Sequence, residues 1–300
     1  MNQENIKPAA SEKASPHQDK RGSALSAQRF QMLEDIAQEL TGDIVFPTCF
    51  DVLVNLRRAL QDPNYTLKQI AGLINLDPLI STRILCLANS VAFNPNGVEA
   101  HDIKTAINRL GLTLVRSTVM AIAINQFRLS KHMESFEKTT RKLWEHSVYA
   151  ASAANVVARR LTNLNTDDAM LAGLVHDLGA FYMIYRASQY EELRIRPDTV
   201  KHLVCQWHES IGHSLLLALG LPENIVEAVS DHDQPRELPT TPKNLRDVVY
   251  VANFLAGGLG ASFNNTANAA DGEPVAIPEP YLALSDEIQA KAKEMMSSFS

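Results

Sequence analysis

The doublet His176-Asp177 is the part of the sequence whose residue types are best suited to chemistry. It lies in the run 171–180, LAGLVHDLGA, where every other residue is apolar or glycine. An unpaired charge is expensive to bury, so an imidazole and a carboxylate in such a run need partners. The doublet therefore either forms hydrogen bonds within the core or faces a metal ion. Composition alone favours a structural pair, because most buried polar groups are simply hydrogen-bonded.

Further candidate ligands occur on other predicted helices: His146 upstream, and His208, His232 and Asn253 downstream. Imidazole nitrogens together with carboxylate oxygens suit Fe, Mn, Zn or Mg, with water at the open positions. A site of this kind hydrolyses phosphoesters by lowering the pKa of a bound water and clamping a phosphoryl oxygen. His213 is an additional pocket candidate, although a solvated or core role is favoured for it.

These polar residues are expected to meet. Each of His146, His176, Asp177 and His208 lies on an otherwise apolar predicted helix, where an isolated polar group would cost about 1–3 kcal/mol. Convergence lets each side chain satisfy another, with or without an ion. We therefore expect them to lie close together, near Asn253.

The elements that position these side chains are predicted to be helices throughout. Apolar residues recur at helical spacing, no segment alternates with period 2, and the predicted fold class is all-α. Helix starts are marked by a capping-box spacing at Thr66, by Asp77-Pro78 and by Asp102. One helix, capped by Asp167-Asp168, is predicted to contain the doublet, and another to run from the turn 220–223 to residues 231–233. The remaining predicted helices cover residues 29–42, 50–62, 67–74, 78–88, 102–110, 113–127, 143–161, 182–190, 201–219, 245–255 and 281–296.

The composition of successive segments predicts the domain organisation of the chain. Residues 1–26 are polar and aperiodic, which predicts a disordered tail, followed by one domain over 27–256. Residues 257–280, rich in Gly, Ala, Asn and Pro, predict a mobile loop before a C-terminal helix within 281–300.

Charge and cysteine usage exclude some classes of protein. The net charge of −6 offers no broad electrostatic footprint for nucleic acid. A membrane span is not expected, because the chain contains no run of about 18 apolar residues. The three cysteines are scattered and odd in number, which fits buried thiols in a reducing, cytoplasmic compartment.

The segment around Asn75-Leu76-Asp77 leaves an alternative open. Two short helices joined there would suit a helix-turn-helix that presents Ser81, Thr82 and Arg83 to a DNA groove. Simple helix packing is favoured, because only Arg83 is basic in that helix and the chain is acidic overall.

Several motifs resemble known proteins. Trp144-Glu145-His146, residues 172–179 (AGLVHDLG) and residues 208–213 (HESIGH) resemble the HD superfamily of metal-dependent phosphohydrolases. Phe46-Pro47, residues 77–90 (DPLISTRILCLANS) and residues 106–112 (AINRLGL) resemble, more narrowly, the HDOD domain, an HD-related output domain of bacterial signalling proteins. The resemblance covers about residues 42–236 of the chain.

The resemblance implies an N-terminal helical bundle packed on a degenerate HD-type helical bundle. Carried over, the HD ligand pattern falls on His146, His176, Asp177 and position 253, which is Asn253 instead of an aspartate. A neutral amide is a poorer ligand than a carboxylate for a hard cation. We therefore expect weak occupancy by a divalent metal (Fe, Mn, Mg or Zn) and little or no hydrolysis, and an Asn253→Asp change is expected to raise metal affinity. The Gly-Tyr-Pro motif of the cyclic-di-GMP phosphodiesterase branch is absent.

HDOD domains are usually treated as signal-transduction modules without demonstrated hydrolase activity. The function implied is that of a bacterial, cytoplasmic, non-catalytic regulatory module, acting on a protein partner in a signalling pathway or on a nucleotide-like small ligand. The first alternative is a metal-dependent HD-type phosphohydrolase that acts on a nucleotide or cyclic dinucleotide. The second is the helix-turn-helix regulator, although neither nucleic acid nor membrane is an expected partner.

Overall fold

The computed structural model describes residues 23–41, 51–62, 64–91, 93–259 and 277–298. Within these residues every regular element is a helix and none is a strand, so the predicted all-α class is confirmed. The helices are α1 (Ser23–Thr41), α2 (Asp51–Gln61), α3 (Leu67–Ile74), α4 (Pro78–Asn89), α5 (Ile103–Leu110), α6 (Leu112–Arg128), the 3-10 helix η2 (Lys131–Phe136), α7 (Glu137–Leu161), α8 (Thr166–Val175), α9 (Leu178–Ser188), α10 (Glu191–Arg194), α11 (Pro197–Ala218), α12 (Glu223–Ala228), α13 (Leu245–Leu255), α15 (Glu279–Leu282) and α16 (Ser285–Ser298).

Three helices begin at the cap residues that the sequence marks. The Thr66 side chain accepts a hydrogen bond from the Gln69 amide while Gln69 bonds back to the Thr66 amide, which completes the capping box of α3. Asp77 caps α4 and Asp102 caps α5 through their carboxylates. These side chains satisfy amide groups that a helix leaves unpaired in its first turn.

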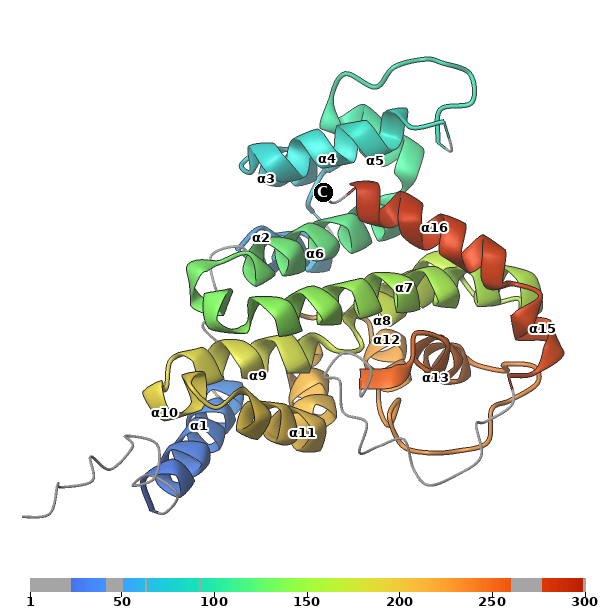
Figure 1. Cartoon of the computed structure of the whole chain (residues 1–300). Helices are drawn as coiled ribbons and strands as arrows, with labels where there is room; N and C mark the ends of the chain where they lie inside the picture. The colour runs from blue at the N-terminus through green and yellow to red at the C-terminus, as the bar shows by residue number, and fades with distance from the viewer. Residues whose placement is uncertain (1–22, 42–50, 63, 92, 260–276, 299–300) are drawn as a thin grey trace, which may run out of the picture.

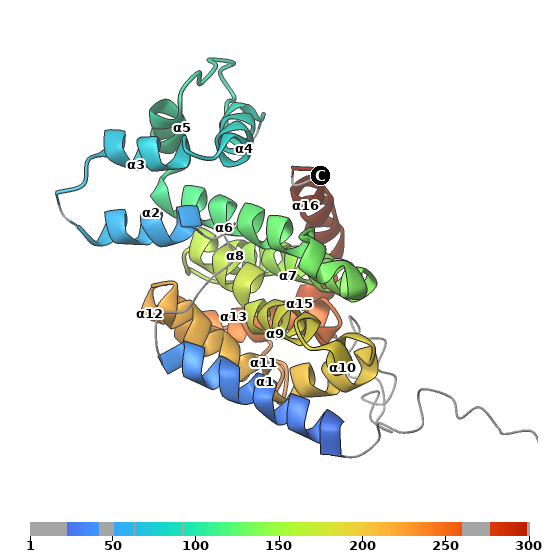
Figure 2. The ribbon, with the colours of Figure 1, turned by 90° about the vertical axis from the view of Figure 1, so that its left-hand side faces the viewer.

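The helices are arranged around α7, the longest of them. Figure 1 shows α3, α4 and α5 together above α6, and α6 lying along α7. Helices α8, α13 and α16 pack directly on α7, and α9 packs on α11 (Figures 1 and 2). This arrangement brings the inner parts of α7 and α11, the junction of α8 and α9, the turn after α12 and the helix α13 toward one region.

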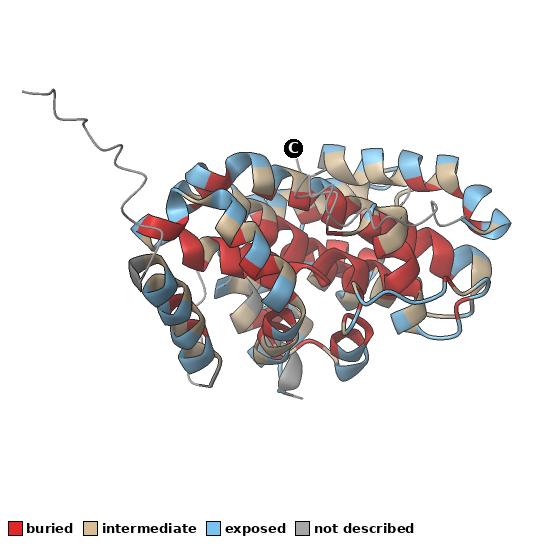
Figure 3. Cartoon of the chain, turned by 60° about the horizontal axis from the view of Figure 1, so that its bottom comes forward, coloured by how far each residue is buried: buried red, intermediate tan, exposed pale blue. Residues whose placement is uncertain are grey.

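One apolar core joins both halves of the chain. It includes Ile80 of α4, Val119 of α6, Val175 of α8 and Leu215 of α11, all fully buried. A smaller core ties α7 to α13, α15 and α16. In Figure 3 the buried residues follow the central helices, whereas exposed residues lie on the outer faces. The residues of the candidate site therefore lie in a continuous, tightly packed interior.

The N-terminal helix α1 is attached by both polar and apolar contacts. Glu39 accepts hydrogen bonds from Tyr182 and Arg186 of α9, and Asp35 accepts one from Tyr190. Apolar contacts are also present, since Ile36 is buried. Figure 2 shows α1 lying along α11. Helix α1 therefore covers the helices that carry part of the candidate site.

The chain termini differ from the prediction. Helix α1 begins at Ser23, so the last four residues of the predicted tail are helical, and residues 1–22 lie outside the described residues. Residues 260–276 of the predicted loop also lie outside them. The predicted helix 281–296 is two helices, α15 and α16, and the break between them lets Tyr281, Leu284 and Ile288 all reach the smaller core.

Helices α3 and α4 bear on two further expectations. Ile80, Ile84 and Ala88 of α4 are buried, which agrees with helix packing as the role of this helix. The cysteine thiols were predicted to be buried, and this prediction is wrong for Cys86 of α4, which is exposed. In the part of the chain that the structure describes, no single helix has the length and apolar character of a membrane span. Two pairs of helices, α3 with α4 and α5 with α6, have that length and apolar character only when the two helices of a pair are combined, and each pair is sharply bent.

Candidate metal centre

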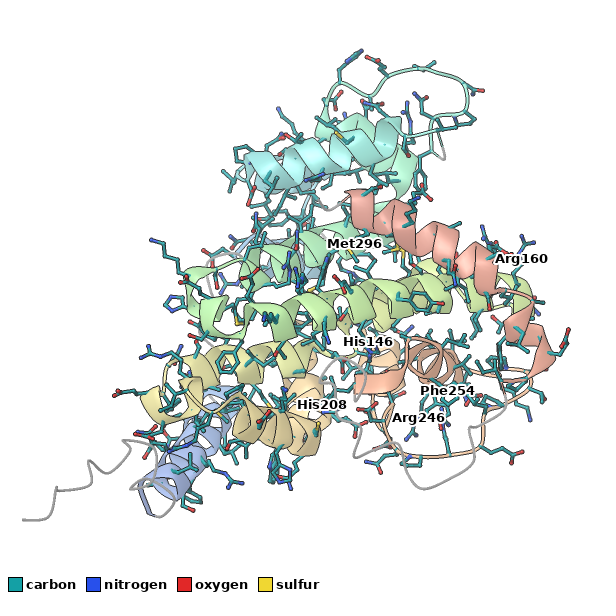
Figure 4. All side chains as sticks on the ribbon, in the orientation of Figure 1. His146, Arg160, His208, Arg246, Phe254 and Met296 are labelled. Atoms are coloured by element: carbon teal, nitrogen blue, oxygen red, sulfur yellow. The ribbon has the colours of Figure 1, made fainter. Side chains whose placement is uncertain are left out.

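Four histidines from separate parts of the fold surround one carboxylate. His146 comes from α7 and His208 from α11 (both labelled in Figure 4), His232 from the turn after α12, and His176 directly precedes Asp177. All five side chains are buried, with residue exposures between 0% and 5%. We call these five residues the histidine–aspartate cluster.

The doublet lies at a break between two helices. The sequence pattern predicted a position inside one helix, and this prediction is wrong. Helix α8 ends at Val175, α9 begins at Leu178, and Asp177 leaves the helical conformation at φ −100° and ψ 16°. Neighbours on one helix diverge by about 100°. At the break His176 Nε2 instead comes within 3.3 Å of Asp177 Oδ2. The sequence hides the break because Leu174, Val175 and Leu178 on both sides of it are buried.

Two glycine contacts bring the helices of the cluster together. A Cβ atom at Gly179 of α9 would lie 2.1 Å from the His208 carbonyl oxygen, so only glycine allows α9 and α11 to approach this closely. A Cβ atom at Gly173 of α8 would lie 2.8 Å from the Ala150 carbonyl oxygen of α7. These close contacts place His208 and His146 next to the doublet.

Asp177 divides the cluster into two halves. Its Oδ2 atom lies 3.4 Å from His146 Nε2 and 3.3 Å from His176 Nε2. Its Oδ1 atom lies 3.2 Å from His232 Nε2 and 3.6 Å from His208 Nε2. Each half thus offers two imidazoles and one oxygen of a shared carboxylate, with the possible ligand atoms within 4.8 Å of one another.

The other ring nitrogen of each histidine faces a backbone carbonyl oxygen. The Nδ1 atoms of His176, His208 and His232 lie 2.8, 2.9 and 2.7 Å from the carbonyl oxygens of residues 173, 204 and 229. His146 Nδ1 lies 3.3 Å from the carbonyl oxygen of residue 256. A carbonyl can only accept, so each Nδ1 carries a proton and each neutral ring presents an Nε2 lone pair to the centre. Outer contacts of this kind orient histidines that bind metals.

In each half of the cluster the two Nε2 atoms lie too close to each other for both imidazole rings to be neutral. His146 Nε2 lies 3.1 Å from His176 Nε2, and His208 Nε2 lies 3.2 Å from His232 Nε2. Two facing lone pairs repel each other unless a proton or a cation lies between them. Asp177 Oδ2 is also buried without a hydrogen-bond donor of suitable geometry. The residues present therefore fit a bound cation.

Burial and charge act in opposite directions on ionisation. Burial disfavours the Asp177 carboxylate, but the surrounding imidazoles, above all those of His176 and His232, outweigh burial and hold the pKa of Asp177 well below its usual range. Burial lowers the pKa of His146 and of His208. Burial opposes protonation of His232 too, but its hydrogen bond to Asp177 raises its pKa to about 9. In the metal-free protein the carboxylate and His232 consequently form a buried ion pair.

The donor set narrows the choice of metal. Imidazole-rich sites suit Zn, Fe, Cu or Ni, whereas Mg favours oxygen ligands. With four imidazoles around a single central carboxylate, Mg is the least suited of the ions expected from the sequence. The cluster can hold one cation on each side of Asp177.

Asn253 of α13 borders the cluster without entering it. Its side-chain amide donates to the His232 carbonyl oxygen at 3.0 Å and to Asp233 Oδ1 at 2.7 Å. Asp233 Oδ2 in turn lies 3.5 Å from His208 Nε2. Asp233 is not among the candidate ligands that the sequence pattern indicates, although His232-Asp233 repeats the residue pair of the central doublet.

His213 lies outside the cluster. It occupies α11 with His208, but its Nδ1 atom faces the Ser230 hydroxyl at 3.2 Å. Helix α12 ends at Ala228, before the predicted 231–233, and His232 lies in the turn that follows. The turn lets His232 point inward while Ser230 meets His213.

Comparison with known proteins agrees with this architecture. A family model for the HDOD domain matches residues 46–235. The chain is also 24% identical over 268 residues to an uncharacterized protein from Treponema pallidum (strain Nichols), covering 82% of this chain and 48% of that protein. It thus spans about half the length of that curated relative.

Two crystal structures are similar over most of the chain. One is a candidate metal-dependent phosphohydrolase from Shewanella amazonensis SB2B, with a TM-score of 0.66, 25% identity and coverage of 91% of this chain and 100% of that one. The other is an HDOD domain protein of unknown function from Geobacter sulfurreducens, with a TM-score of 0.52, 21% identity and coverage of 90% and 97%. The second likeness concerns the fold alone.

Proposed function

The chain belongs to the HDOD domain family, and we propose that it acts as a metal-binding signal-transduction module that does not hydrolyse phosphoesters. The histidine–aspartate cluster would hold the cations through His146, His176 and Asp177 on one side and Asp177, His208 and His232 on the other. A cation bound there could in principle polarise a phosphoryl oxygen or activate water. In this protein the cation would fix the relative positions of α7, α9 and α11 and would not take part in hydrolysis.

The single observation that carries this proposal is the burial of the cluster behind an acidic edge. All five of its side chains are enclosed. Of the described side chains that form ion pairs with the cluster, two are partly exposed: Glu209 and Asp233. A phosphodiester is an anion, and two carboxylates at the edge repel it. An active hydrolase needs the opposite, an open ligand position that a substrate can reach.

A regulatory module also needs a surface for its partner. Leu76 in the turn before α4, and Val91 and Val98 in the segment after it, are exposed by 72%, 89% and 67%. These exposed apolar side chains are available for contact with a protein partner in a bacterial signalling pathway, which we propose over a nucleotide-like small ligand.

A phosphohydrolase is the second candidate. The similarity to the Shewanella amazonensis protein favours it, as does the presence in each half of two imidazoles and a carboxylate oxygen. Three protein ligands with a remaining open position are typical of catalytic metal sites. The burial of the cluster and its acidic edge argue against it.

Turnover separates the two candidates. The full chain, loaded in turn with Zn²⁺, Fe²⁺ and Mn²⁺, is incubated with a nitrophenyl phosphodiester, nucleoside triphosphates and cyclic dinucleotides, with His176→Ala as the matched control. We expect no hydrolysis above that of the control. Turnover at about 1 per second, an ordinary enzymatic rate, that disappears in His176→Ala would replace the module by a phosphohydrolase.

A further inference from the structure

We propose that Asp233 supplies the charge that Asn253 lacks, so that Asp177, His208, His232 and Asp233 form a four-ligand cation site. Asn253 would be a positioning residue for Asp233 rather than a ligand. This inference rests on the proposed function, because it assigns the ligands of one half of the same cluster. It also predicts that the two halves bind cations unequally.

The contacts of Asp233 hold its carboxylate toward the cluster. Its Oδ1 atom accepts a hydrogen bond from Asn253 Nδ2 at 2.7 Å, and its Oδ2 atom lies 3.5 Å from His208 Nε2. Its backbone amide donates to Glu209 Oε1 at 2.9 Å, which ties this part of the turn to α11. Asp233 is thus fixed from two helices, one of which also carries His208.

An unpaired atom at Asn253 independently indicates a ligand. The side chain of Asn253 is in a residue only 3% exposed, and its Oδ1 atom is buried without a hydrogen-bond partner. The amide cannot be reversed to relieve this, because its nitrogen already donates to the His232 carbonyl oxygen and to Asp233 Oδ1. A buried acceptor without a donor is destabilising, and a water bound to a cation beside Asp233 would satisfy it.

Charge balance distinguishes the two halves. Asp177 and Asp233 bring two negative charges to the half that contains His208 and His232, which matches a divalent cation. The half that contains His146 and His176 has only the shared Asp177. Because an uncompensated buried charge is expensive, the first cation should bind beside Asp233 and the second more weakly.

The same contacts change the expected effect of Asn253→Asp. The sequence pattern predicts higher metal affinity for this variant. In the structure an aspartate at 253 could no longer donate to the His232 carbonyl oxygen, and it would place a second carboxylate beside Asp233, where the amide now lies at 2.7 Å. We therefore expect Asn253→Asp to misplace Asp233 and weaken the tighter site.

The test is a Zn²⁺ titration of the metal-free full chain against a competing chelator. Asp233→Asn keeps the shape of the side chain and its bond from Asn253 but removes the charge. Asp231→Asn is the matched control, because Asp231 pairs with Arg246 at the surface and lies two residues away. We expect Asp233→Asn to weaken the tighter site by at least about tenfold, as loss of a group beside a metal commonly does, while Asp231→Asn binds like the wild type.

The outcomes separate this inference from the function it rests on. If Asp233→Asn binds Zn²⁺ as tightly as the wild type, Asp233 is not a ligand, although the cluster still binds metal. If the wild type itself binds no metal, the proposed function and the inference both fail. Melting temperatures without metal that agree within about 2 °C across the three proteins, a difference of roughly 1 kcal/mol or less, show that the variants are folded.

Discussion

Replacing Gly179 by alanine should disrupt the contact that holds the cluster together. The added Cβ atom would lie 2.1 Å from the His208 carbonyl oxygen and 2.6 Å from the Gly212 amide nitrogen. Both neighbours are backbone atoms of α11, so no side-chain rotation relieves the overlap. Helices α9 and α11 must separate, which moves His208 away from Asp177.

The reciprocal substitution provides a matched control. A Cβ atom at Gly212 would lie 3.3 Å from the Gly179 amide nitrogen, which is tight but needs only a small adjustment. Gly212 is inside α11, where alanine is favoured over glycine by about 1 kcal/mol. The two effects oppose each other, and we expect Gly212→Ala to change the free energy of unfolding by less than about 1 kcal/mol.

Gly179→Ala should be far more damaging. Overpacking in a rigid core commonly costs about 1–3 kcal/mol, and the backbone overlap places this site at the upper end of that range or beyond. For a chain of this size about 3 kcal/mol corresponds to a fall in melting temperature of roughly 6–12 °C. Urea unfolding and calorimetry of the metal-free proteins measure it, and a Zn²⁺ titration reports the loss of the His208 half. A Gly179→Ala protein as stable as Gly212→Ala, with unchanged metal binding, would refute this account of the α9–α11 contact.

Three further substitutions test other parts of the structure. Asp177→Asn should let the buried His232 lose its proton at neutral pH, because the hydrogen bond to Asp177 is what raises its pKa to about 9, and should lower the free energy of unfolding in urea by about 1–3 kcal/mol through the lost hydrogen bonds; an NMR titration of the metal-free variant in which His232 still titrates as in the wild type would contradict the buried ion pair. Tyr190 hydrogen-bonds to Asp35 and lowers its pKa below 3.8, so this contact stabilises α1 above that pH and the effect is lost as pH falls through the lowered pKa. The melting temperature of Asp35→Asn should therefore fall below that of the wild type at neutral pH and approach it as the pH falls through the lowered pKa, and a difference independent of pH would contradict this. Glu287→Gln, which removes an exposed ion pair between α16 and α7, should change stability by less than about 1 kcal/mol in urea; a larger loss would show that the pair anchors α16.

Local signals explain which helices were predictable. Thr66, Asp77 and Asp102 cap their helices through contacts within three residues along the chain, so their sequence spacing is sufficient. The bounds of α13 also agree with its apolar stripe. The break at the doublet was not predictable, because apolar residues continue through it, and the close contact of Gly179 with α11 involves residues far along the chain.

The candidate site shows the same division. His146, His176 and His208 were identifiable because each interrupts an apolar stripe, where a polar side chain needs a partner. Asp233 lies in a turn, where acidic residues are common, and its one local signal is that His232-Asp233 repeats the residue pair of the doublet. Its proximity to His208 follows from the way the turn after α12 folds against α11 and α13, which sequence spacing does not encode.

Anomalous X-ray scattering from crystals of the full chain grown with Zn²⁺ tests the central claim most directly. We predict two peaks, one on each side of the Asp177 carboxylate, each about 2.0–2.1 Å from two Nε2 atoms. The stronger peak should lie between His208, His232 and Asp233. A map without a peak at bonding distance from any of the four histidines, at a zinc concentration that saturates binding in solution, would contradict the metal-binding account.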